Sequence, residues 1–175
     1  MTGMMLRRVG NSALLVLGGL TAGCATTGQN NLTDGNVVAV AMALNNGEIM
    51  TSQPAISKAA NARVKTFAQL MIDHHTAANG QLAAVGIPAQ ENAMSQALTQ
   101  TATELTASLS PLSGEQFDRA YMRAQIQLHE TALRTLTNVL IPETESGALL
   151  NVLQQMRATV VSHLEMARDI DDDLN

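Results

Sequence analysis

The sequence contains few aromatic residues, few charged residues and a single cysteine. One tyrosine, two phenylalanines and no tryptophan occur among its 175 residues, so it lacks the aromatic platform on which many proteins stack single-stranded nucleic acids. The lone cysteine, Cys24, excludes an internal disulfide bond and a metal site built from several thiolates. With a net charge of −5, the chain also lacks the basic excess that binds nucleic acid or anionic lipid headgroups.

Apolar residues make up 46 % of the chain, whereas aromatic residues make up only 2 %. The core must therefore consist of Ala, Leu, Val, Ile and Met, which suit the close packing of helices. A chain of this length can form one domain with a substantial core. Because no segment has the alternating pattern of a β-strand, we expect a single all-α domain.

The N-terminal segment resembles a bacterial lipoprotein signal peptide. Arg7 and Arg8 precede an apolar run at residues 13–20, which is too short to span a bilayer. The sequence Leu20-Thr21-Ala22-Gly23-Cys24 then resembles a lipobox, which implies cleavage before Cys24 and lipidation of that residue. The alternative is a plain signal peptide in which the cysteine occurs by chance.

Removal of residues 1–23 would leave a short tether followed by the folded domain. Residues 24–32 are rich in Thr, Gly, Gln and Asn, a composition typical of flexible linkers. Ala25, rather than aspartate, follows the cysteine, which in lipoproteins of this type implies export to the outer membrane. We therefore predict a cell-envelope protein that faces the periplasm and contacts the membrane through the lipid on Cys24.

Apolar residues at steps of three and four predict four long helices, with a weaker helix between the second and the third. Thr33 or Asp34 can cap the first helix and Asn61 the second, and Ser113 begins a capping box for the third. Pro54 should kink or divide the first helix. The expected helices cover residues 34–59, 62–85, 91–109, 114–140 and a last segment from 144 or 146 to about 170.

Connected in this order, the helices predict a ferritin-like four-helix bundle over residues 33–173. Two helical hairpins would be joined by a crossover that contains the weaker helix, which is long enough to carry the chain back along the bundle. The acidic residues at 169–173 should fray into solvent, because the helix dipole disfavours anions at a C-terminus.

Each long helix carries one polar residue within its apolar face, namely Glu48, His75, His129 or His163. The heights of these residues along the expected bundle scatter by about six residues, or roughly 9 Å at the helical rise per residue. The boundaries of the expected helices carry an error of about the same size, so the four side chains can share one layer. His74 is rotated away from this face, and we expect it at the surface or at its boundary.

Two interpretations of these four residues remain open. In the first, each histidine is a core residue that hydrogen-bonds across the bundle, and the protein is a structural or interaction module of the envelope. In the alternative, Glu48, His75, His129 and His163 form a buried site for Zn, Fe, Mn or Cu, and the protein binds a metal or performs metal-dependent redox chemistry.

The sequence supports neither a di-iron enzyme nor a hydrolase. The Glu-x-x-His pairs of di-iron proteins are absent, because positions 72, 126 and 160 are Ile, Ile and Val. No nucleophile elbow of a hydrolase occurs. Asp118, in the first turn of the third long helix, is explained by the helix dipole. We therefore predict no catalytic residue.

Several short motifs together resemble one bacterial family of unknown function, DUF4142, whose members are often called predicted outer membrane proteins. The resemblance covers residues 33–170 and implies a ferritin-like helical bundle in the cell envelope, with no established reaction. The chain departs from the family pattern at His74, where the family has aspartate, and at Pro54, where it has leucine. The motifs are Asn45-Asn46-Gly47-Glu48-Ile49, Val64-Lys65-x-Phe67-Ala68-Gln69-x-Met71, His75-Thr76-x-x-Asn79, Ser113-Gly114-x-x-Phe117-Asp118-x-x-Tyr121, His129-Glu130 and His163-Leu164-x-x-Ala167.

Overall fold

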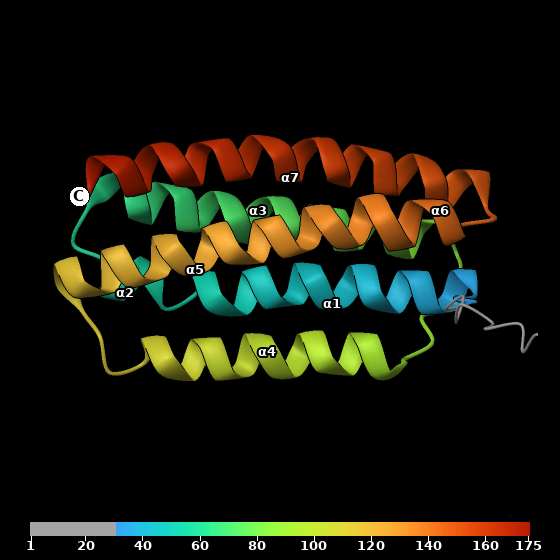
Figure 1. Ribbon diagram of the computed structural model, residues 1–175, viewed down its shortest axis with the longest axis horizontal. Helices are drawn as coiled ribbons and strands as arrows, with labels where there is room; N and C mark the ends of the chain where they lie inside the picture. The colour runs from blue at the N-terminus through green and yellow to red at the C-terminus, as the bar shows by residue number, and fades with distance from the viewer. Residues whose placement is uncertain (1–30) are drawn as a thin grey trace, which may run out of the picture. The chain divides into compact units, whose positions relative to one another are not determined.

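The computed structural model describes residues 31–175, which form a bundle of helices without a β-strand in that range (Figure 1). The predicted all-α fold class is confirmed. The predicted signal peptide and all but the last two residues of the tether lie outside the described range. The elements are α1 (Asp34–Ser52), α2 (Ala55–Lys58), α3 (Ala62–Ala84), α4 (Ala93–Leu109), α5 (Gly114–Thr135), the π-helix η1 (Leu136–Leu140), α6 (Ile141–Glu143) and α7 (Gly147–Asp173).

Helices α1, α3, α5 and α7 run side by side, and α4 lies against the outer side of α1 (Figure 1). The pair α1 and α3 forms one hairpin, α4 carries the chain back, and α5 and α7 form the second hairpin. Helix α4 approaches α1 closely at Gly47, where an added Cβ would lie 3.1 Å from the Cβ of Ala102. Within residues 31–175, no helix combines the length and the hydropathy needed to cross a bilayer.

The predicted helix starts and breaks follow from local hydrogen bonds. Thr33 and Asn36 form a capping box at the start of α1, and the side chain of Asn61 accepts a hydrogen bond from the backbone N–H of Arg63 at the start of α3. Pro54 divides the first predicted helix into α1 and α2, because its ring cannot continue the hydrogen-bond ladder. Ser146 caps α7.

Two local predictions are corrected by the structure, and one local feature was not predicted. Ser113 precedes α5, but its side chain accepts no capping hydrogen bond, because Gly114 adopts φ 64° where a capping box requires a helical first residue. The third long helix contains the π-helix η1, which the sequence pattern did not predict. The acidic end of α7 remains helical to Asp173, since Arg63 forms ion pairs with Asp169 and Asp173.

The core consists of two apolar clusters separated by a layer of buried polar side chains. One cluster combines the start of α1 with the end of α5, η1 and the start of α7. The other combines α2 with the starts of α3 and α5 and the end of α7. The buried polar side chains between them come from all four long helices and comprise Asn45, Glu48, Thr51, Ser52, His75, Gln125, His129 and His163. The predicted layer of polar residues is therefore present.

Candidate metal centre

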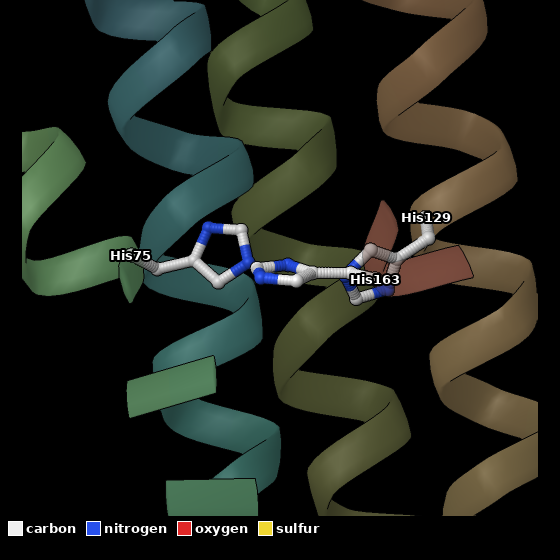
Figure 2. Close-up of side chains that lie close together, drawn as sticks. All are labelled: His75, His129 and His163. Carbon is white, nitrogen blue, oxygen red and sulfur yellow. The ribbon is translucent and has the colours of Figure 1, made fainter. Parts of the chain in front are cut away.

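Three histidines from three different helices converge in the polar layer. His75 on α3, His129 on α5 and His163 on α7 each offer a ring nitrogen, and the three nitrogens lie within 4.8 Å of one another. Their ring centroids are 5.4 to 5.9 Å apart, and the three rings lie next to one another (Figure 2). All three side chains are buried, because each occupies an apolar position in the helical repeat of its own helix.

The ring of His75 is oriented by an asparagine on α1. Its Nδ1 lies 3.0 Å from Oδ1 of Asn45, whose amide nitrogen in turn donates to Oδ1 of Asn79 at 2.9 Å. Because an amide oxygen only accepts, this contact places the imidazole proton on Nδ1. Nε2 of His75 then carries a lone pair, and it is buried with no hydrogen-bond partner among the described residues.

The ring of His129 is held by the backbone of its own helix. Its Nδ1 lies 2.8 Å from the carbonyl oxygen of Gln125, an acceptor, so Nδ1 carries the proton. Nε2 therefore also has a lone pair, and it lies 3.3 Å from Nδ1 of His163. Both His75 and His129 thus keep one unprotonated nitrogen on the side that faces the other histidines.

The outer partner of His163 is His74, the residue next to His75 on α3. Nε2 of His163 lies 2.9 Å from Nδ1 of His74, and the two rings stack with centroids 5.1 Å apart. Either nitrogen of His163 can carry the proton. When the proton is on Nε2, it is donated to His74, and the lone pair on Nδ1 faces His129.

Glu48, the predicted fourth ligand, lies behind His129. Its Oε1 is 3.3 Å from Nδ1 of His129, the nitrogen that also contacts the Gln125 carbonyl. Oε2 has no hydrogen-bond partner within residues 31–175. Burial raises the pKa of Glu48 to about 8, because the low-dielectric interior disfavours the carboxylate. The structure therefore brings Glu48 into contact with one histidine, outside the group formed by the three ring nitrogens.

The electrostatic setting keeps the three imidazoles neutral. Burial lowers the pKa of His129 to about 4, and burial together with the neighbouring His129 and His74 lowers that of His163 to about 3. Burial, and then the other histidines, also hold the pKa of His75 well below its ordinary range. Since a metal ion binds the unprotonated imidazole, the residues are ready to act as ligands at neutral pH.

Sequence reasoning found the three histidines but missed their partners. His74 is exposed as predicted, yet it hydrogen-bonds His163, and Asn45, which the sequence presented only as part of a family motif, contacts His75. The position of His74 directly before His75 was a usable signal for the first contact. Asn45 lies three residues before Glu48 on the same helix face, which was the corresponding signal for the second. Asp118 is also buried, and it accepts backbone hydrogen bonds from Ala60 and Asn61 rather than merely facing the dipole of its own helix.

Comparison with protein families gives one match. The model of the family described as "Domain of unknown function (DUF4142)" matches residues 20–170. No curated protein and no solved structure matched the chain in the corresponding searches. The family match spans most of the sequence, including all three histidines of the cluster and Glu48. The chain therefore belongs to the DUF4142 family of domains of unknown function.

Proposed function

We propose that the protein binds one transition-metal ion through His75, His129 and His163. The observation that carries this proposal is the buried Nε2 of His75, which faces the other two rings without a hydrogen-bond partner among the described residues. A histidine that only stabilised the core would normally have both ring nitrogens satisfied, because an unpaired buried polar atom costs about 1–3 kcal/mol. A cation at this point would bind the lone pair.

The outer hydrogen bonds support the same conclusion. Asn45, the Gln125 carbonyl and His74 each contact the nitrogen that the metal would not use. Such partners fix the orientation and the tautomer of metal-binding histidines. The separation of 3.3 Å between Nε2 of His129 and Nδ1 of His163 also fits, since two nitrogens on a tetrahedral ion would lie roughly 3.3 Å apart.

The donor set favours zinc or copper. Neutral imidazoles suit Zn, Cu, Fe and Ni, whereas Mn prefers carboxylates, and affinities of such sites peak at Cu²⁺. Glu48 acts in this proposal as a neighbour of the ligand His129, because its Oε1 contacts Nδ1 of that ring. The structural or interaction module remains the competing function, and the absence of bound metal in the experiment below would favour it.

A second proposal concerns location. We propose that the mature protein is anchored in the outer membrane by a lipid on Cys24, with the helical domain facing the periplasm. Its support is the order of the N-terminal features, in which two arginines and a short apolar run precede Leu20-Thr21-Ala22-Gly23-Cys24. This position would expose the metal centre to the metal ions of the periplasm.

Metal analysis tests the first proposal directly. Protein without a histidine tag, stripped with a chelator and reloaded, should retain one equivalent of Zn²⁺ or Cu²⁺ after desalting. Its thermal midpoint should rise on loading and fall again with chelator, because the ion binds only the folded chain. His163→Ala and His129→Gln should each abolish both effects. A chain that retains no stoichiometric metal, and whose melting ignores chelator, would overturn the proposal.

Neighbouring asparagines on α1 provide a matched control. Asn45→Leu removes the acceptor that orients His75, so metal affinity in a competition titration should fall about 10- to 100-fold while the stoichiometry remains one. Asn46→Leu changes the adjacent exposed residue, which contacts Asn79 rather than a histidine, and should leave the affinity unchanged. Equal losses in the two variants would contradict the proposed role of Asn45.

A further inference from the structure

Two pockets flank the polar layer on different sides of the bundle. The first, which we call the α3–α7 pocket, has a volume of about 230 Å³ and is lined by Asn45, His74, His75, Gln155, Met156 and Thr159, among others. The second, the α1–α4 pocket, has a volume of about 420 Å³ and is lined by residues of α1, α4 and α5 that include Glu48 and Glu104. Only the first of these two borders a histidine of the cluster.

The charges of the two pockets differ. None of the ten residues that line the α3–α7 pocket is Asp, Glu, Lys or Arg, and its polar groups are amides, two imidazoles and a threonine hydroxyl. The α1–α4 pocket contains two glutamates. A negatively charged molecule would therefore meet no carboxyl group in the lining of the α3–α7 pocket, whereas in the other pocket it would be repelled by Glu104, and by Glu48 as well above a pH of about 8.

The cluster supplies only three metal ligands, which leaves a role for a negatively charged molecule as the fourth. Three neutral imidazoles do not compensate the charge of a divalent ion, and a buried charge without a counter-charge is costly. A site with three protein ligands also leaves one position of a tetrahedral ion for a ligand from solution. Glu48 contacts the outer nitrogen of His129 and so lies on the far side of that ring from His163.

On the basis of the metal centre proposed above, we propose that a small inorganic anion completes the coordination of the ion and reaches it through the α3–α7 pocket. The pocket volume of about 230 Å³ equals that of nearly eight water molecules at about 30 Å³ each. It accommodates an anion of a few atoms together with its remaining hydration water. His75, which lines the pocket and supplies a ligand nitrogen, connects the two.

Azide binding to the cobalt-substituted protein tests this proposal. The visible absorption of Co²⁺ reports its coordination, so azide should produce a saturable spectral change in the wild type. Thr159→Trp places a large side chain at an exposed position of the α3–α7 pocket, one turn before His163, and should weaken azide binding at least tenfold with one equivalent of cobalt retained. Gln155→Trp, at another exposed position of this pocket, is the second variant in case the first folds poorly.

Thr101→Trp is the matched control. It is also a threonine-to-tryptophan change at an exposed position, but it fills the α1–α4 pocket instead of the α3–α7 pocket. It should leave azide affinity at the wild-type value. Stoichiometric cobalt with no spectral response to azide would overturn the anion proposal and leave the metal centre intact. An equal loss of azide affinity in Thr159→Trp and Thr101→Trp would overturn the route through the α3–α7 pocket. Failure of the wild type to bind cobalt would overturn both the centre and the anion site.

Discussion

Among individual residues, Glu48 and the histidines respond to pH in opposite directions. Glu48 has a pKa of about 8 in the folded protein against an ordinary value of 4.5, so the unfolded chain ionises first as pH rises and stability falls across that window. His129 and His163 have pKa values of about 4 and 3 against 6.5, so the unfolded chain binds their protons first as pH falls below 6.5. The metal-free protein should therefore be most stable near pH 6.5.

Glu48→Gln separates these two contributions. Between pH 6.5 and 8 the urea midpoint of the metal-free wild type should decline, since one ionising group contributes up to about 1.4 kcal/mol per pH unit. The variant cannot ionise at this position, so its midpoint should stay level over the same range while the decline below pH 6.5 remains. Glu104→Gln, at an exposed position, should behave like the wild type. A decline of the same size in Glu48→Gln would show that another group causes it.

Among the helices, two carboxylates tie the bundle together at opposite ends. Asp118 on α5 is buried and accepts hydrogen bonds from the backbone N–H groups of Ala60, at 3.1 and 3.3 Å, and of Asn61, at 2.8 Å, just before α3. Asp34 on α1 accepts from the N–H groups of Glu145 and Ser146, each at 3.0 Å, just before α7. Each carboxylate therefore satisfies donors that precede another helix.

Asp118→Asn should destabilise the protein more than Asp34→Asn. The amide retains one acceptor oxygen but turns a donor toward the backbone N–H groups, and the loss of charge-assisted hydrogen bonds at a buried position costs about 1.5–3 kcal/mol. Asp34 is only partly buried, so in Asp34→Asn water can replace part of the lost hydrogen bonding. Urea unfolding at pH 7 gives both values. The interpretation of Asp118 would be contradicted if the two variants lost equal stability.

The helices themselves were predictable because their apolar positions repeat every three or four residues and their caps are local. The same repeat put His75, His129 and His163 on inward faces, which is why the cluster could be anticipated. The sequence positions of His74 and Asn45 indicated that both lie near the cluster, but they did not give the contacts of Nδ1 of His75 with Asn45 and of Nε2 of His163 with His74, since the contacting atoms depend on side-chain rotamers and helix rotation. The π-helix η1 was missed because π-helices are rare and a repeat of three and four residues does not distinguish one turn of π-helix from the α-helix around it.

For the whole molecule, the proposed lipid anchor determines where the protein resides. Cys24 lies outside the described residues, so this proposal depends on its sequence context alone. In the native host, the wild type should be found in the outer-membrane fraction and should incorporate labelled fatty acid. Cys24→Ser should lose the label, because the serine hydroxyl does not replace the thiol in lipid transfer. The proposal would fail if the wild type carried no label, or if Cys24→Ser still incorporated it.

Helix α4 packs mainly on α1 and touches α5, so it is held along one side of the bundle (Figure 1). A segment attached in this way opens at a lower free energy than the four helices around the core. Its departure would uncover the α1–α4 pocket, in which Glu48 takes part, without unfolding the histidine cluster. The detachment of one helix, α4, would thus be enough to bring the buried carboxyl group of Glu48 into contact with bulk water. The rate at which α4 detaches would then limit how fast Glu48 exchanges its proton.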